Sequence, residues 1–318
     1  MCTAISFVSK DFYFGRNLDL EYCYDENVVI VPRYFPFRFC DIHYAMIGMA
    51  YVQENYPLYY DAVNECGLGM AGLNFPGNAF YMPKSDNKEN IAPYEFIPWV
   101  LSQCKSVDEA EQLLRKTNLA DIDFNERLKA TPLHWFIADK NKSIVAEPAK
   151  NGLMVYENPV GVLTNNPPFC VQLQNLNNYI NVSAYPARNN FSDKLDLDEY
   201  SRGMGAIGLP GDLSSQSRFV KAAFTKLNSI SGETEEESIS QFFHILYSVY
   251  QQRGCVRLGD KYEITQYSSC CNANRGIYYY TTYENSSITA VNMNRENLDS
   301  TKLISYPLIK KQKINMQN

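Results

Sequence analysis

The chain has 318 residues and a mass of 36.4 kDa, which is enough for one large core or for two domains of about 150 residues each. With 45% hydrophobic and 20% charged residues it falls in the globular range, which excludes a disordered or fibrous chain. Its 29 basic and 35 acidic side chains give a net charge of −6, which argues against nucleic acid or an anionic membrane surface as the main partner.

The N-terminus predicts a chain without a secretion signal. The first charged residue, Lys10, is followed at once by Asp11, so the basic start and apolar run of a signal peptide are missing. No uncharged apolar run reaches the roughly 18 residues that cross a bilayer, which predicts no membrane insertion. The nine cysteines form no CxxC pair, and only three histidines are present. We therefore expect free thiols in a reducing cytoplasm and no metal site.

The first half of the chain predicts strands followed by two helices. Residues rich in β-branched and aromatic side chains predict strands over 3–7, 12–16, 28–31 and 44–51, with a turn at Ser9 and Lys10. Helical patterns follow over 94–104 and 107–116. The second of these helices is expected to open with a capping box formed by Ser106 and Glu109.

The second half repeats this order. Strands are predicted over 133–138, 143–147 and 162–164, helices over 217–227 and 234–251, and closing strands over 263–271, 276–282 and 287–293. A capping box from Thr234 to Glu237 is expected to begin the second helix. The polar stretch 175–204 is interpreted as an excursion on a single domain, 1–318, and as a candidate oligomer contact. The order favours an α+β fold with sheets sandwiched between helix layers.

One glycine motif has to be weighed against a nucleotide site. Residues 67–72 read GLGMAG, which matches GxGxxG. A dinucleotide fingerprint needs a helix directly after the glycines, and here Pro76 and Gly77 would end a helix within one turn. The glycines are therefore interpreted as parts of a tightly packed strand, and no cofactor is predicted.

Cys2 is the strongest candidate for chemistry. Removal of Met1 before a small residue would leave Cys2 with a thiol and a free α-amine, so that nucleophile and base share one residue. Both groups have ordinary pKa values close to neutrality, near 8.5 and 8 respectively. A start such as Met-Cys-Thr is common, however, and does not by itself identify a nucleophile.

The next predicted strand carries Arg16 and Asp19. A turn centred on Ser9 and Lys10 pairs residues whose numbers add up to about 18 or 19, which places Cys2 opposite Arg16 or Asn17. A guanidinium there would favour the thiolate, and Asp19 would hold the amine. The alternative is an exposed ion pair within one hairpin.

The histidines offer no conventional catalytic group. His43, His134 and His244 are each flanked by apolar or aromatic residues and are predicted to be packed structural side chains. A Cys-His or Ser-His-Asp enzyme would need one of them in a cleft. This elimination favours a nucleophile that supplies its own base.

Several further motifs occur in order along almost the whole chain. They are Met1-Cys2-Thr3, FGRNLD at 14–19, NECGLGMAGLNFP at 64–76, LHW at 133–135, GVLTNNP at 161–167, GLPGD at 208–212, SRF at 217–219 and TQY at 265–267. Together they resemble the choloylglycine hydrolase family, which comprises bile salt hydrolases and penicillin V acylases. The family belongs to the N-terminal nucleophile hydrolases, so the resemblance implies a four-layer αββα sandwich.

The resemblance also implies roles for individual residues. Cys2 would be the nucleophile, with Arg16 and Asp19 as its immediate partners. Asn74 and Asn165 would form the oxyanion hole, since neutral amides can donate to an oxygen that becomes negative only in the intermediate. Arg218 would complete the polar network. By motif neighbourhood, the steroid side of the pocket would be lined by Phe124, Leu128 and Leu133, with Tyr22 and Tyr24 nearby; ordinary core packing is the alternative for these residues.

The implied activity is hydrolysis of glycine- or taurine-conjugated bile salts, without metal or cofactor, by a cytoplasmic homotetramer. Asn74 favours this branch, because the resemblance implies a tyrosine there in penicillin V acylases. An acylase acting on penicillin V or on N-acyl homoserine lactones remains open, as does a binding homologue without turnover. The sequence leaves open the preference for glycine or taurine.

Overall fold

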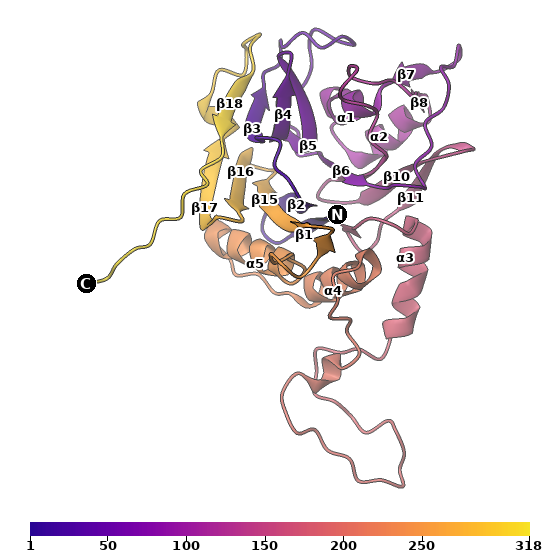
Figure 1. The fold of residues 1–318 in the computed structure, drawn as a ribbon, viewed down its shortest axis with the longest axis vertical. Coiled ribbons are helices and arrows are strands. Elements are labelled where there is room, and N and C mark those ends of the chain that lie inside the picture. The colour runs from indigo at the N-terminus through magenta and orange to yellow at the C-terminus, as the bar shows by residue number, and fades with distance from the viewer.

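The computed structural model describes residues 1–318 and contains two stacked antiparallel sheets covered by helices on their outer faces (Figure 1). Helices α4 and α5 cover the six-stranded sheet, and α1 and α2 cover the eight-stranded sheet. The predicted α+β, four-layer αββα sandwich is therefore confirmed. No helix is long and apolar enough to cross a membrane.

The six-stranded sheet carries the N-terminus in its interior. Its strands are antiparallel to their neighbours, and the chain order is broken because β12 and β15 flank the N-terminal hairpin. In spatial order the strands are β12 (Val162–Leu163), β1 (Cys2–Val8), β2 (Phe12–Leu20), β15 (Ile264–Asn272), β16 (Ile277–Thr282) and β17 (Asn285–Asn292).

The eight-stranded sheet is built mainly from the first half of the chain. Its spatial order is β11 (Gly152–Glu157), β10 (Ser143–Ala149), β9 (Leu133–Ala138), β6 (Gly69–Asn74), β5 (Tyr56–Asn64), β4 (Met46–Gln53), β3 (Asn27–Val31) and β18 (Ile304–Pro307). Two small pairs stand apart from it: β7 (Glu89–Ile91) with β8 (Thr117–Leu119), and β13 (Arg257–Leu258) with β14 (Lys261–Tyr262).

The helices are α1 (Phe96–Gln103), α2 (Val107–Leu114), α3 (Phe169–Asn175), α4 (Ser215–Asn228) and α5 (Glu235–Tyr247), with short 3-10 turns at Pro93–Glu95, Leu176–Tyr179, Met204–Ala206 and Met293–Arg295. The capping box from Thr234 to Glu237 is confirmed. At α2 only half of the expected box forms, because Ser106 accepts from the Glu109 amide but the Glu109 carboxylate accepts from the amide of Lys105 instead.

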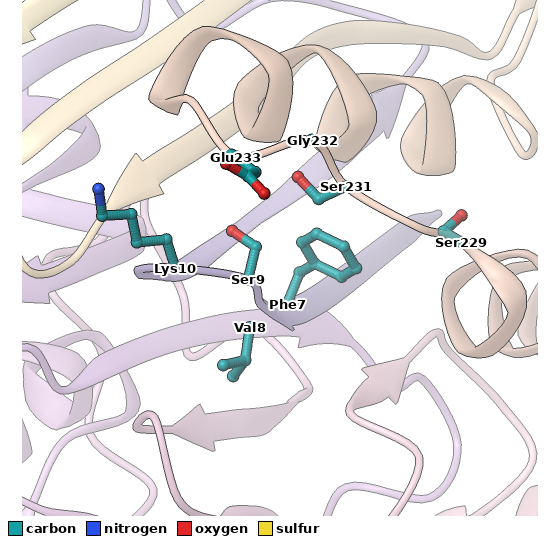
Figure 2. A pocket seen from close by; sticks show the side chains of 8 residues that line it. All are labelled: Phe7, Val8, Ser9, Lys10, Ser229, Ser231, Gly232 and Glu233. Atoms are coloured by element: carbon teal, nitrogen blue, oxygen red, sulfur yellow. The ribbon is translucent and has the colours of Figure 1, made fainter.

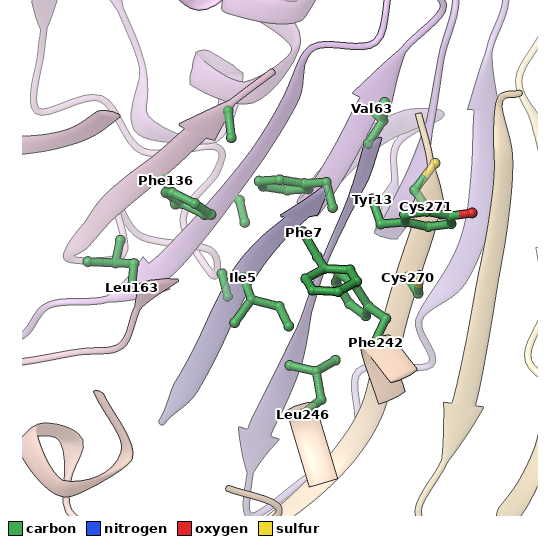
Figure 3. Close-up of a cluster of buried hydrophobic side chains, with 14 of the residues drawn as sticks. Ile5, Phe7, Tyr13, Val63, Phe136, Leu163, Phe242, Leu246, Cys270 and Cys271 are labelled. Atoms are coloured by element: carbon green, nitrogen blue, oxygen red, sulfur yellow. The ribbon is translucent and has the colours of Figure 1, made fainter. Parts of the chain in front are cut away.

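The turn between β1 and β2 reaches the connection from α4 to α5. Phe7 to Lys10 and Ser229 to Glu233 line a shallow depression there (Figure 2). Below it, apolar side chains fill the space between the sheets and the space under α5. Ile5, Phe7, Phe242 and Leu246 belong to this core (Figure 3). A second core packs the eight-stranded sheet against α1 and α2.

The glycines of the GxGxxG match lie in or next to β6, as predicted from their failure to fit a nucleotide site. A Cβ at Gly69 would lie 2.5 Å from the ring of Phe14, and one at Gly72 would lie 3.1 Å from Trp135 Nε1. Both glycines therefore allow close packing of β6 on its neighbours.

Eight helices and strands of the structure have no counterpart in the sequence prediction: β5, β7, β8, β11, α3, β13, β14 and β18. Pro57 interrupts the β5 pattern, although it lies at the end of the β4–β5 hairpin, where a strand tolerates proline. Helix α3 begins directly after Pro167 and Pro168, and a pair of prolines is more typical of a turn or loop.

The segment between α3 and α4 extends far from the sandwich, and its tip is the part of the chain most distant from both sheets (Figure 1). It exposes apolar side chains at Ile180, Tyr185, Phe191, Leu195, Leu197, Tyr200 and Ile207. A large exposed apolar surface on an otherwise polar loop is typical of a contact with another protein.

Candidate active site

Cys2 begins β1, and its pairing with β2 differs from the prediction. Cys2 lies opposite Leu18, and Arg16 lies opposite Ala4, so paired residue numbers add up to 20. The predicted placement of Cys2 opposite Arg16 or Asn17 was wrong because the turn contains three residues between Val8 and Phe12. Side chains alternate along strands, so Cys2 and Arg16 still lie on the same face, one diagonal apart.

Arg16 is completely buried between the sheets. Its Nη1 donates to the carbonyl oxygens of Tyr60, at 2.9 Å, and Gly72, at 2.5 Å, while Nη2 has no hydrogen-bond partner. Burial lowers the pKa of Arg16, but the nearby Cys2 thiol, Tyr267 and Asp61 outweigh this and the net pKa is raised. The side chain is therefore a permanent cation beside Cys2.

The carbonyl that holds Arg16 comes from a β-bulge. Met49 pairs with Asp61 and Ala50 pairs with Tyr59, so Tyr60 is the extra residue of β5. A bulged residue leaves the ladder, which frees its main chain for another contact. This bulge is not visible in the sequence, and it explains how β5 reaches a residue of the other sheet.

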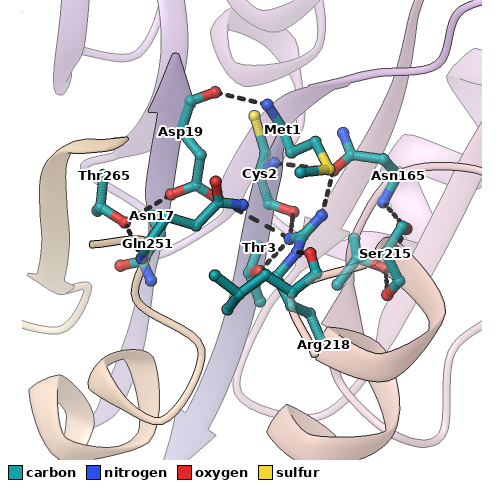
Figure 4. A network of polar contacts seen from close by, with 12 residues as sticks. Met1, Cys2, Thr3, Asn17, Asp19, Asn165, Ser215, Arg218, Gln251 and Thr265 are labelled. Carbon is teal, nitrogen blue, oxygen red and sulfur yellow. Dashed lines mark hydrogen bonds and ion pairs between the residues drawn. The ribbon is translucent and has the colours of Figure 1, made fainter. Parts of the chain in front are cut away.

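Arg218 lies on the face of the six-stranded sheet that is opposite to Arg16 (Figure 4). It reaches from α4 and donates to the Cys2 carbonyl at 2.5 Å, to Thr3 Oγ1 at 2.6 Å and to Asn165 Oδ1 at 2.8 Å. Burial lowers the pKa of Arg218, and the Asp19 carboxylate, 3.9 Å away, opposes this. Arg218 thus binds the main chain of Cys2, whereas Arg16 faces its side chain.

Asp19 is fully buried on the same face as Arg218. It accepts a hydrogen bond from Thr265 Oγ1 at 2.7 Å and a longer one from Gln251 Nε2 at 3.4 Å. Burial raises the pKa of the Asp19 carboxyl, and Arg218, the N-terminal ammonium and Thr265 act against the rise. The structure brings Asp19 and Arg218 together.

The N-terminal amine of the chain contacts a group that the sequence interpretation missed. The amine of Met1 donates to the main-chain carbonyl of Asp19 at 2.5 Å and to Glu263 Oε1 at 2.5 Å. The prediction that the Asp19 carboxylate holds the α-amine concerns Cys2 after removal of Met1, and it stays a prediction, because the amine of the full chain belongs to Met1. Glu263 had been read only as the first residue of a strand, and it is 5% exposed.

Asn165 connects Cys2 to Asn74. The Cys2 backbone N–H donates to Asn165 Oδ1 at 2.8 Å, and Asn165 Nδ2 donates to the Asn74 carbonyl at 2.7 Å. Asn165 is held in turn by Ser215, whose hydroxyl accepts from its backbone amide. Asn74 is half-buried at the end of β6. Asn165 therefore contacts Cys2 directly, whereas Asn74 is connected to Cys2 through Asn165.

The three histidines lie in different environments. His43 and His134 are buried and bonded to carbonyl oxygens, and His134 also contacts Glu147 at 3.0 Å. The prediction that His244 is packed was wrong. Its α5 neighbours Phe243 and Ile245 are buried, but His244 lies on the outward stripe of the helix.

An apolar cavity lies beside this polar centre, on the eight-stranded sheet. Its lining is mostly hydrophobic and includes Tyr24, Phe124, Leu128 and Leu133 together with Tyr51, Tyr59, Tyr94, Ile97 and Trp135. Tyr22 is outside the lining and half exposed, with its hydroxyl 2.9 Å from that of Tyr24.

The cavity and the polar centre share part of the main chain. Tyr60 and Gly72 line the cavity, and the same two residues supply the carbonyls that bind Arg16. A molecule in the cavity therefore lies next to the backbone that positions Arg16. No group of three or more His, Cys, Asp or Glu side chains is arranged to hold a metal ion.

Comparisons with known proteins agree with this geometry. The family model described as linear amide C–N hydrolases, choloylglycine hydrolase family, matches residues 2–306. The chain is 58% identical to a bile salt hydrolase/transferase of Lactiplantibacillus plantarum, with 97% of each chain covered. It is 39% identical to a bile salt hydrolase/transferase of Clostridium perfringens, with 100% of each covered.

Solved structures extend the comparison to the fold. The C2A mutant of the conjugated bile acid hydrolase from Clostridium perfringens superposes with a TM-score of 0.91 at 38% identity, covering 100% of both chains. A penicillin V acylase from Agrobacterium tumefaciens superposes with a TM-score of 0.75 at 18% identity, over 96% of this chain and 90% of the acylase, and so shares the fold. The chain therefore belongs to the choloylglycine hydrolase family of linear amide C–N hydrolases.

Proposed function

We propose that this protein hydrolyses the amide bond that joins a bile acid to glycine or taurine, with Cys2 as the nucleophile. The observation that carries the proposal is the placement of Cys2 in a buried network of two arginines and a carboxylate, next to an apolar cavity. Relatives that are 58% and 39% identical over nearly the whole chain are named bile salt hydrolases/transferases.

The reaction would proceed through a thioester. After removal of Met1, the Cys2 α-amine takes the thiol proton, and the sulfur attacks the amide carbon. The C–N bond then breaks, the amino acid leaves with that proton, and the acyl group stays on sulfur. Water deprotonated by the α-amine attacks the thioester, which releases the bile acid and restores the thiol.

The arginines and asparagines would act electrostatically. Arg16 lies on the face of Cys2 and favours its thiolate, while Asp19 and Arg218 form the charged pair on the other face. Asn74 and Asn165 would donate to the oxyanion of the tetrahedral intermediate, since their side chains do not titrate, Asn165 contacts Cys2 and Asn74 contacts Asn165.

The cavity would take the steroid. Phe124, Leu128 and Leu133 supply apolar walls, and burial of a rigid apolar ring system gives about 25 cal/mol for each Å² removed from water. Recognition on the acyl side should therefore exceed recognition of the leaving amino acid. Because Tyr22 is outside the lining, it is not included in this pocket.

The alternative substrates are penicillin V and N-acyl homoserine lactones. The presence of Asn74, the cavity and the two bile salt relatives favour bile salts. A binding protein without turnover is disfavoured because Cys2, Arg16, Asp19, Asn165 and Arg218 are all present and brought together.

A substrate panel tests the function. Glycocholate, taurocholate, penicillin V and a long-chain acyl homoserine lactone are incubated separately with the protein, and released amine or free acid is measured. We expect both bile conjugates to be cleaved well ahead of the others. Faster cleavage of penicillin V would assign the protein to the acylases and leave the roles of Cys2, Arg16 and Asp19 unchanged.

Maturation can be tested separately. In the full chain the nitrogen of Cys2 is a peptide N–H bonded to Asn165, so it cannot serve as a base until Met1 is removed. The intact mass of active protein should be lower than that of the full chain by one methionine. A fully active preparation that keeps Met1 would exclude the α-amine as base.

We also propose a cytoplasmic homotetramer that assembles through the excursion 175–204. The exposed apolar residues of this region, Tyr185, Phe191 and Tyr200 among them, support the contact. Light scattering should give four times the chain mass, and Phe191→Asp with Tyr200→Asp should lower it. An unchanged mass in that double variant would place the contact elsewhere.

A further inference from the structure

Strand β15 contains a bulge at the TQY motif, which the proposed function does not use. Thr265 pairs with Asp19 and Tyr267 pairs with Leu18, so Gln266 is the extra residue. In a regular strand Thr265 and Tyr267 would point to the same face, but one inserted residue reverses the second side chain. Gln266 Nε2 donates to the Leu20 carbonyl at 2.8 Å, which fixes the bulge on β2.

On the helix-facing side, Thr265 holds Asp19. The Thr265 hydroxyl donates to Asp19 Oδ1 at 2.7 Å and accepts from the backbone N–H of Gln251 at 2.9 Å. The hydroxyl has one proton, and the second contact commits that proton to the carboxylate. Thr265 is 0% exposed, so water cannot replace it as a donor.

On the inter-sheet side, Tyr267 holds Asp61. This carboxylate is 1% exposed and accepts from the Tyr267 hydroxyl at 2.7 Å, the Tyr278 hydroxyl at 2.7 Å and Ser269 Oγ at 3.2 Å. Asp61 belongs to β5, and its three donors belong to β15 and β16. It therefore ties the two sheets together through a buried charge.

Asp61 is linked to Arg16 in two ways. It follows Tyr60, the bulged residue whose carbonyl accepts from Arg16 Nη1 at 2.9 Å. Its donor Ser269 also accepts from the Arg16 backbone N–H at 3.1 Å. A shift of Asp61 would therefore move both the carbonyl and the hydroxyl that fix Arg16.

We infer that the β15 bulge at Gln266 is a positioning device for the nucleophile, in which Thr265 fixes Asp19 on one face and Tyr267 fixes Arg16 through Asp61 on the other. Neither residue contacts Cys2 in the structure, so both are positioning residues. The inference rests on the proposed function for the roles of Asp19 and Arg16. It adds Asp61, Thr265 and Tyr267 to the residues that determine turnover.

The effect of removing the Thr265 hydrogen bond from the Asp19 carboxylate depends on the other charged and titratable groups that face this carboxylate. They are Arg218 from α4, Arg16 from β2, Tyr250 after α5, Glu263 directly before β15 and, until Met1 is removed, the Met1 amine. In Thr265→Val the shape is retained and the donor is lost, so protonation of Asp19 becomes easier. We expect the acidic limb of the kcat/KM profile for glycocholate to move up by about one pH unit.

At neutral pH, Thr265→Val is expected to lower kcat about tenfold with KM unchanged, which is what the loss of one hydrogen bond to a charged group gives. Thr265→Ser keeps the hydroxyl and should restore both kcat and the position of the acidic limb in the kcat/KM profile. Thr282→Val is the matched control, because Thr282 on β16 bonds only the Asn285 backbone N–H.

For the other face, Tyr267→Phe is expected to lower kcat about tenfold with KM unchanged. Asp61→Asn is measured alone and together with Tyr267→Phe. If Tyr267 acts through Asp61, the double variant should lose much less than the product of the two single effects. Tyr280→Phe is the control, since the buried Tyr280 hydroxyl accepts from the Ile309 backbone N–H.

Two sets of results would overturn the inference. One is a fall in thermal stability in Thr265→Val and Tyr267→Phe with the pH profile and kcat equal to those of the controls. The other is independent, multiplicative effects of Tyr267→Phe and Asp61→Asn on kcat. Either result would make the bulge a purely structural feature.

Alkylation separates this inference from the proposed function, because it needs no substrate. The rate at which iodoacetamide modifies Cys2 is followed against pH by mass spectrometry. Tyr267→Phe should raise the midpoint of this pH dependence by about one pH unit, since a displaced Arg16 stabilises the Cys2 thiolate less. If the wild-type protein cleaves no bile salt but the midpoint moves, the function is wrong and the inference on Arg16 holds. An unmoved midpoint contradicts the inference.

Discussion

The polar centre around Cys2 and the apolar cavity beside it are built in different ways. Arg16, Asp19 and Arg218 are completely buried, and each is held by groups of at least one other element. Phe124 and Leu128 lie in a loop between β8 and β9 and are only partly buried, with Phe124 bonded to Leu128 within the loop itself. The candidate catalytic groups are thus fixed by sheet pairing, whereas the proposed steroid pocket includes a loop, and loops tolerate change.

The largest difference between the two regions should appear at Cys2. Cys2→Ser is expected to fold normally and to lose turnover by at least about a thousandfold, because a hydroxyl is a poor nucleophile for a base as weak as an α-amine. Steady-state hydrolysis of glycocholate measures this. Cys66→Ala is the control, since Cys66 is exposed and outside both regions. Wild-type rates in Cys2→Ser would refute the assignment of the nucleophile.

Arg218→Met should destabilise the fold in a pH-dependent way. Removal of the cation 3.9 Å from Asp19 raises the pKa of that carboxyl further above its unfolded value. Between these two values the unfolded chain gives up its proton first, so stability falls as pH rises. We expect a loss of about 3–5 kcal/mol at pH 7.5 and a smaller loss at pH 5, measured by urea unfolding. A loss independent of pH would show that Asp19 does not depend on Arg218.

Substitutions in the cavity should affect substrate binding rather than turnover. Leu128→Ala removes apolar contact area worth about 1–2 kcal/mol and is expected to raise KM for glycocholate by roughly tenfold with kcat unchanged. A lowered kcat with constant KM would mean that the loop also positions the reacting amide. The loop would then contribute to turnover as well as to substrate binding, and the distinction between the two regions would not hold there.

The smallest effect is expected at the edge of the cavity. Tyr22 is 41% exposed and outside the lining, whereas its neighbour Tyr24 belongs to it. Tyr22→Ala should therefore change KM by less than about twofold, and Tyr24→Ala should change it more. Equal effects of the two substitutions would extend the pocket to Tyr22.

Sequence patterns were sufficient for the layer order and for most of the helices and strands. The hydrophobic periodicity of α5 and its capping box depend on neighbours three and four residues apart, which a sequence displays directly. The same periodicity misplaced His244, because its apolar neighbours were read as its environment although they point to the other side.

The candidate site residues were found through ordered motifs and not through spacing. Cys2, Arg16, Asp19, Asn74, Asn165 and Arg218 come from five separate parts of the fold, and Arg16 and Asp19 lie on opposite faces of β2. The strand register of that hairpin was predicted wrongly by one or two residues, since the length of a turn is weakly specified by its composition.

The sequence by itself determined the family, the sandwich and the candidate nucleophile, because ordered motifs and local periodicity are properties of the chain. Only the tertiary structure decided that Glu263 binds the N-terminal amine and that Tyr60 and Gly72 join the cavity to Arg16. It also decided that Thr265 and Tyr267 serve opposite faces of one sheet. These contacts depend on two single-residue bulges, and a bulge is defined by the partner strand, which local sequence does not contain.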